Sequence, residues 1–190
     1  TRNILAFQDL GESNNFGNPI VMQNGDFIFP DNSHNSLNPD EFIDEIAFQT
    51  GDSIRNVEEI TSALSIYEQN GLQFYQSIDY EKIENARRLL PSEYTFHNKL
   101  GFISLNQSLN SDEVLAVAFQ YTYNGIVYQV GEFSNDIIAP DVLVLKLLKS
   151  TMTDVSQPIW RLMMKNVYGL GAYQVNREDF VLDIFYENPD

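Results

Sequence analysis

The sequence has no cysteine and few basic residues. Without cysteine, no disulfide, thiolate metal site or redox dithiol can form. The two histidines, His34 and His97, are too few to indicate a zinc centre. The chain carries 11 basic and 27 acidic side chains, a net charge of −16, which disfavours contact with nucleic acid and with anionic membrane surfaces. We therefore expect no bound metal, no cofactor and no nucleic-acid partner.

Long apolar runs are also missing. A spanning helix needs about 20 apolar residues, and the longest apolar run here is interrupted by Lys146 and Lys149. We therefore expect no direct insertion of this chain into a bilayer. Hydrophobic residues make up 43% and aromatic residues 13% of the chain, too much for a disordered acidic tail. The composition predicts one soluble folded domain over residues 1–190, excised from a larger protein.

The negative charge is concentrated near the N-terminus. Residues 1–60 hold 11 acidic and 2 basic side chains, and much of the asparagine lies in the same part of the chain. Because Asn and Asp favour turns, we expect residues 11–40 to be rich in loops, with short strands near 20–22 and 26–29. Residues 1–50 then form an acidic, Asn-rich, loop-rich part, and residues 51–190 hold the main sheet and the helices.

Three helices are predicted from apolar spacing. The first spans residues 53–68, with an apolar stripe at three- and four-residue intervals and Ser53 as its N-cap. The second spans residues 158–168, with Pro158 at a tolerated first position, Ser156 or Gln157 as the cap and Gly169 just past the end. Its methionine-rich stripe is typical of core packing and less often of an adaptable binding surface. A third, short helix is expected over residues 80–90.

The strongest local pattern is a hairpin over residues 114–131. Asn124-Gly125 is the preferred two-residue turn, so it pairs Tyr121 with Tyr128 and Phe119 with Val130. One face of the hairpin is then aromatic, and we expect it to be buried; an exposed face would favour a platform for sugar or peptide.

Strands outnumber helices in the prediction. Further strands are expected over residues 73–78, 94–105, 142–148, 172–175 and 180–186. The fold class is therefore predicted as α+β, mainly an antiparallel, sandwich-like sheet with two or three packed helices.

The sequence shows no pattern typical of catalysis. Residues 31–42 carry oxygen ligands at EF-hand positions one, three and five, but Ser36 and Phe42 replace the required glycine and glutamate. A looser calcium site stays open, although a solvated acidic loop is the simpler interpretation; its candidate ligands are Asp31, Asp40, Glu41, Asp44 and Glu45. Gly169 and Gly171 lack the third glycine of a dinucleotide loop. We therefore predict no catalytic, cofactor-binding or metal-binding residues and no enzymatic activity, and leave the binding residues unassigned.

Several long strings resemble one family. They are ENARRLLPSEYTF (84–96), LGFISLN (100–106), DEVLAVAFQYTYNG (112–125), YQVGEF (128–133), LKLLKS (145–150), WRLMMKNVY (160–168) and GAYQV (171–175). Together they resemble the SprA family of cell-surface gliding-motility and secretion proteins.

The resemblance implies a fragment of a giant outer-membrane β-barrel, the translocon of the type IX secretion system. The chain lacks the serial alternating strands and the lipid-facing apolar band of a barrel wall. We therefore expect a soluble scaffold or gating domain associated with the outer membrane, on the extracellular face in preference to the periplasmic one. Its expected partners are the rest of the barrel, accessory subunits and secreted proteins in transit. The alternative function is a carbohydrate-binding β-sandwich that uses Tyr121 and Tyr128.

Overall fold

A computed structural model describes most of the chain outside the acidic N-terminal part. The described residues are 1–10, 51–66, 74–123, 125–155 and 157–164, the backbone of 22–23 and 26–27, and residues 174, 176, 178, 180, 181, 183 and 185. None of the helices in these ranges combines the length and hydrophobicity that a membrane crossing requires.

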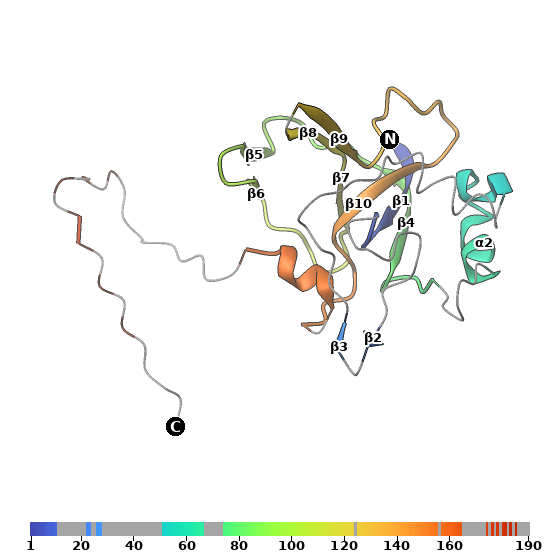
Figure 1. Ribbon diagram of the computed structural model, residues 1–190, viewed down its shortest axis with the longest axis horizontal. Helices are drawn as coiled ribbons and strands as arrows, with labels where there is room; N and C mark the ends of the chain where they lie inside the picture. The colour runs from blue at the N-terminus through green and yellow to red at the C-terminus, as the bar shows by residue number, and fades with distance from the viewer. Residues whose placement is uncertain are drawn as a thin grey trace.

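A four-stranded sheet forms the centre of the structure (Figure 1). Its strands, in the order β4-β1-β10-β7, are β4 (Tyr80–Ala86), β1 (Arg2–Phe7), β10 (Leu143–Lys149) and β7 (Leu115–Val117). The two central strands are parallel, with Leu5 opposite Val144, whereas β4 and β7 pair with them in antiparallel fashion. The predicted α+β class with mainly antiparallel strands is confirmed. The parallel pairing of β1 with β10 was not predicted.

Three two-stranded ribbons accompany the sheet. They are β2 (Met22–Gln23) with β3 (Asp26–Phe27), β5 (Tyr94–His97) with β6 (Phe102–Leu105), and β8 (Phe119–Tyr123) with β9 (Ile126–Val130). The first confirms the short strands expected near 20–22 and 26–29. The second replaces the single strand expected over 94–105, because residues 98–101 turn the chain back and Gly101 adopts a positive φ of 67°. Figure 1 shows β5 and β6 standing away from the central sheet.

The two faces of the sheet are covered by different helices. On one face, Leu5, Phe7 and Val144 pack against residues of the 3-10 helix η1 (Gly51–Arg55) and of α2 (Ile60–Ile66). On the other face, Ala6 and Leu147 pack against Ile159 of the 3-10 helix η2 (Pro158–Leu162). Alternate residues of β1 therefore serve two apolar clusters, as a strand covered on both faces requires.

The helix predicted over 53–68 is present but interrupted. Its apolar positions Ile54, Ile60 and Leu64 are buried, as the spacing predicts. Ser53 lies inside η1 and is not the cap of α2. Asn56 precedes α2 instead: its carbonyl accepts from Ile60 N at 3.1 Å, and its side-chain amide donates to Glu59 Oε1 at 2.7 Å. This pairing of an Asn with a Glu three residues later resembles a capping box.

Two predictions between residues 73 and 90 are wrong. Residues 80–86, expected to start a helix, form strand β4, because pairing with β1 places Tyr80 and Glu81 in the interior. The strand expected over 73–78 is, in its described part, a turn in which Asp79 N donates to Tyr75 O at 2.8 Å.

The remaining predictions concern one strand that is shifted slightly and segments that lie largely outside the described residues. The strand expected over 142–148 is β10, shifted by one residue. The acidic stretch 31–42 and the strand expected over 172–175 lie outside the described residues except Gln174. Of the strand expected over 180–186, only residues 180, 181, 183 and 185 are described, and these four are not in a strand.

Candidate interaction surface

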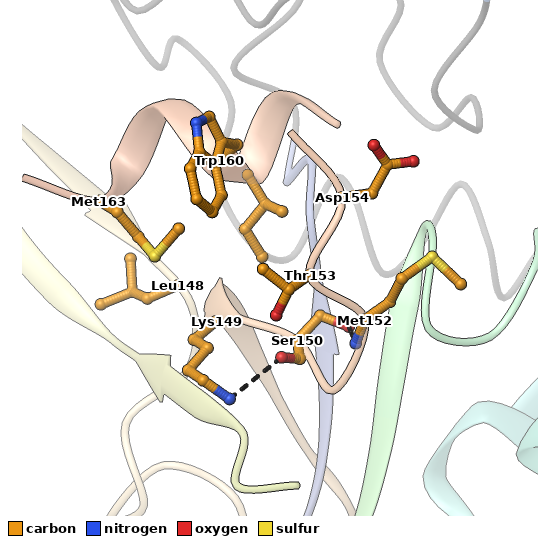
Figure 2. A pocket seen from close by; sticks show the side chains of 9 residues that line it. Leu148, Lys149, Ser150, Met152, Thr153, Asp154, Trp160 and Met163 are labelled. Atoms are coloured by element: carbon orange, nitrogen blue, oxygen red, sulfur yellow. Dashed lines mark hydrogen bonds between the residues drawn. The ribbon is translucent and has the colours of Figure 1, made fainter. Parts of the chain in front are cut away.

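A small concavity lies between η2 and the end of β10. Figure 2 shows Trp160 of η2 and Met163, the residue after η2, facing Leu148, Lys149 and the following Ser150. Its volume is about 30 Å³, whereas pockets for small-molecule ligands measure roughly 300–1,000 Å³. The hollow therefore suits part of one inserted side chain better than a free substrate.

Five exposed apolar side chains lie in the lining of this hollow or next to a lining residue in the sequence. Met152 and Met163 line the hollow, Val155 follows the lining residue Asp154, and Leu162 and Met164 flank Met163. We call these five residues the η2 patch; their exposures range from 37% to 70%. The sequence predicted that the stripe of this helix is core, and this holds for Ile159, which is 7% exposed. It is wrong for Leu162 and Met163. Three of the four methionines of the chain lie in the patch, and methionine adapts to partners of varied shape.

The local sequence explains why η2 is short. Pro158 occupies the first turn and Gln157 before it is extended, with φ −74° and ψ 142°. At the other end Met163 is again extended, with ψ 133°, so the helix ends at Leu162 and not near Gly169 as predicted. The chain thus turns outward at Met163 and leaves Met163 and Met164 on the surface.

Buried Gln8 fixes η2 to the sheet. Gln8 follows β1, is 2% exposed, and its Oε1 accepts a hydrogen bond from Ile159 N at 3.2 Å. Its Nε2 donates to Ile78 O at 2.7 Å, and its main-chain carbonyl accepts from the Lys146 ammonium. One side chain therefore joins η2, β1 and the turn before β4, which holds the η2 patch in place.

A second polar group lies at the same end of the two parallel strands. Glu81, 2% exposed, accepts hydrogen bonds from Ser150 Oγ at 2.7 Å, Thr151 N at 2.9 Å and Thr151 Oγ1 at 2.6 Å. Ser150 Oγ also accepts from Met152 N at 3.2 Å. These contacts satisfy buried oxygens and fix the loop that borders the hollow; sequence reasoning missed them because their donors come from distant segments.

An ion pair fixes the opposite end of β10. Arg55 donates two hydrogen bonds of 2.7 Å to the two carboxylate oxygens of Glu132, which is 4% exposed. Glu132 Oε2 also accepts from Val144 N at 2.8 Å, and Arg55 O accepts from Val142 N at 3.0 Å. Helix η1 and the segment after β9 are thereby joined through β10, and the sheet under the η2 patch is fixed at both ends.

The aromatic face of the β8–β9 hairpin has the predicted register. Tyr121 lies opposite Tyr128 and Phe119 opposite Val130. The rings of Tyr121 and Tyr128 stack at 5.1 Å, and Tyr121 also packs against the main core. Val130 is buried, both tyrosines are half-buried and Phe119 is 43% exposed. The predicted burial therefore holds for Val130, whereas the two stacked tyrosines are only half-buried and Phe119 is exposed.

Three described groups away from the η2 patch have shifted pKa values: Tyr80 and the two members of the Arg87–Glu93 pair. Burial raises the pKa of the Tyr80 phenol, opposed by a hydrogen bond with Thr61. The hydrogen bond from Arg87 lowers the pKa of Glu93, and the bond from Leu90 N lowers it further.

Within the described part of the chain, no three His, Asp or Glu side chains lie close enough together to hold a metal ion. The acidic stretch that suggested calcium lies outside those residues.

Comparisons with known proteins identify no family for this chain. No protein-family model matches it, and no curated protein matches it significantly.

Proposed function

We propose that the chain is a non-catalytic scaffold and gating domain of a SprA-like protein-secretion translocon, required for protein export and gliding motility. The strings that resemble this family include β6, β7 and β8 and parts of β4, β5, β9, β10 and η2. The proposed site is the outer membrane, with the domain in contact with the barrel, its accessory subunits or proteins in transit.

The observation that carries the proposal is the η2 patch on a fixed support. Exposed apolar side chains that gather in one place mark interaction surfaces more often than scattered ones do. A small hollow within such a patch is typical of a contact where one anchor side chain of a partner is inserted. Gln8 holds this surface on a sheet covered on both faces, so it can transmit a contact to the rest of the domain.

A matched pair of substitutions in the full-length protein tests this function. Met164 and Val127 are 58% and 57% exposed, but only Met164 belongs to the η2 patch. Met164→Asp is expected to impair secretion and gliding, because a charge in an apolar contact must be desolvated. Val127→Asp is expected to leave both near the level of the unsubstituted protein.

Deletion of residues 1–190 gives the coarser test. The expected result is loss of secretion or gliding from cells whose barrel still assembles in the outer membrane. Unaltered secretion from such cells would overturn the proposed function, as would equal secretion by the Met164→Asp and Val127→Asp proteins.

A further inference from the structure

The β5–β6 hairpin has an apolar face that no other described strand or helix buries. Side chains two residues apart in a strand share a face, and so do directly opposed residues of a hairpin. Tyr94 lies opposite Leu105 and Phe96 lies opposite Ile103, so these four side chains form one face, which we call the hairpin face. Phe96 is 60% exposed and the other three are half-buried. Neither apolar cluster of the described residues includes any of them.

Local contacts fix the shape of this hairpin. A two-stranded hairpin on its own is only marginally stable in water, and Figure 1 shows this one standing away from the central sheet. At its base, Asn106 N donates to Glu93 O at 2.9 Å, and at its turn Gly101 N donates to His97 O at 2.8 Å. On the opposite face, the rings of His97 and Phe102 stack at 4.2 Å. These contacts order the hairpin face without covering it, so a partner meets a preorganised surface.

The charge of the hairpin is opposite in sign to that of the chain. Residues 94–105 contain Lys99 and no acidic side chain, whereas the whole chain has a net charge of −16. Lys99 lies in the turn beside Leu100, which is 76% exposed, and Arg88 precedes the base of the hairpin. Both cations are exposed, and neither forms an ion pair with another described residue. The hairpin therefore combines an open apolar face with positive charge that is available to a partner.

These two properties favour one kind of occupant. A hairpin gains stability when a helix packs on its apolar face, as helices do on both faces of the central sheet. The exposed side of that helix should be acidic, because Lys99 and Arg88 attract carboxylates. A second copy of the chain and an anionic membrane are disfavoured, since a chain with a charge of −16 repels both. A short acidic segment carries much less charge and can contact the hairpin alone.

We propose that the hairpin face binds an acidic amphipathic helix of another protein. The apolar side of that helix packs on Phe96 and its neighbours, and its carboxylates lie near Lys99 and Arg88. The hairpin face shares no residue with the η2 patch. The inference concerns the chemistry of a partner and does not depend on the proposed role in secretion.

Two synthetic peptides test the charge of the partner. Both have about 18 residues, enough for a helix, with leucine at three- and four-residue spacing. The other positions are glutamate and alanine in one peptide, and glutamine and alanine in the other. Fluorescence anisotropy with the whole 190-residue chain is expected to show tighter binding of the glutamate peptide, although the net charge of the chain would favour the glutamine peptide. Lys99→Glu should weaken binding of the glutamate peptide by about two- to ten-fold.

A pair of phenylalanine substitutions tests the location of the contact. Phe96 and Phe119 are 60% and 43% exposed, but only Phe96 belongs to the hairpin face. Phe96→Ser should weaken binding of the glutamate peptide by about ten-fold or more. Phe119→Ser is the matched control and should leave the affinity as in the unsubstituted chain. Circular dichroism verifies that both variants are folded.

Several results would overturn the proposal. They are failure of the glutamate peptide to bind, binding of the glutamine peptide that is equal or tighter, equal effects of the two phenylalanine substitutions, and an unchanged affinity in Lys99→Glu. A dimer in light scattering that Phe96→Ser dissociates would show that a second copy covers the hairpin face. Binding to vesicles of phosphatidylcholine and phosphatidylglycerol that Phe96→Ser abolishes would show that lipid covers it. Either of these outcomes also contradicts an acidic helix as the partner.

Discussion

The Arg55 guanidinium and the buried Glu132 carboxylate form a two-pronged, partly buried ion pair, with both N–O distances at 2.7 Å. Glu132 is 4% exposed and also accepts a hydrogen bond from Val144 N, so three hydrogen bonds stabilise its carboxylate. Arg55 in turn donates to Val142 O at 3.0 Å. The pair connects η1, β10 and the segment after β9, three parts far apart in sequence.

Removal of Arg55 is expected to destabilise the protein strongly. Arg55→Ala leaves the Glu132 carboxylate buried without its cation, a change that typically costs about 3 kcal/mol. The free energy of unfolding from urea titration measures this loss. Arg87→Ala is the control, because Arg87 forms an ion pair with Glu93 at the surface, where one guanidinium nitrogen donates to both carboxylate oxygens. The expectation is wrong if both substitutions lower the free energy of unfolding equally.

Gln8→Ala is expected to loosen η2. The substitution leaves Ile159 N and Ile78 O without their partner, and an unsatisfied buried group costs about 1–3 kcal/mol. Trp160, adjacent to Ile159, should then become more accessible to acrylamide. Gln120→Ala is the control, since Gln120 is exposed and makes one side-chain contact, at 3.4 Å with Gln129. An unchanged Trp160 signal in Gln8→Ala would show that η2 is held by other contacts.

Local patterns in the sequence predicted part of this fold well. The Asn124-Gly125 turn predicts the β8–β9 register because a two-residue loop determines which residues face each other. The apolar stripe at Ile54, Ile60 and Leu64 likewise identifies the buried face of η1 and α2.

Nonlocal pairing accounts for what the sequence did not reveal. Residues 80–86 contain good helix formers, but β1 offers them a strand partner, and tertiary pairing overrides propensity. Strand β1 itself was missed because Ile4, Leu5, Ala6 and Phe7 form a continuous apolar run, which lacks the alternation of a half-exposed strand. The η2 patch was missed because apolar spacing does not show whether another element covers the stripe.

Gly131 is expected to tolerate alanine less well than Gly125. Both glycines have positive φ values, 73° and 81°, where a side chain costs about 1–2 kcal/mol. At Gly131 an added Cβ would also lie 3.1 Å from Ala118 Cβ and from Val117 O, whereas nothing lies within 4 Å at Gly125. Gly131→Ala should therefore lose about 1–3 kcal/mol more than Gly125→Ala. Thermal unfolding of both variants measures the difference, and equal losses would contradict the crowding at Ala118.

The Arg87–Glu93 pair is expected to give a small loss of stability in acid. Because Arg87 and Leu90 N stabilise the ionised form, the pKa of Glu93 in the folded protein lies below its ordinary value. The stabilisation is therefore complete above the unfolded-state pKa and disappears as the pH falls through the folded-state value. Arg87→Gln should raise the Glu93 pKa towards the ordinary value, although the bond from Leu90 N remains.

A carboxyl NMR titration at low and high salt measures the Glu93 pKa in the unsubstituted protein and in Arg87→Gln. Because the pair is exposed, the shift caused by Arg87 should shrink as salt is added. A Glu93 pKa that is the same in both proteins would show that the backbone bond alone lowers it.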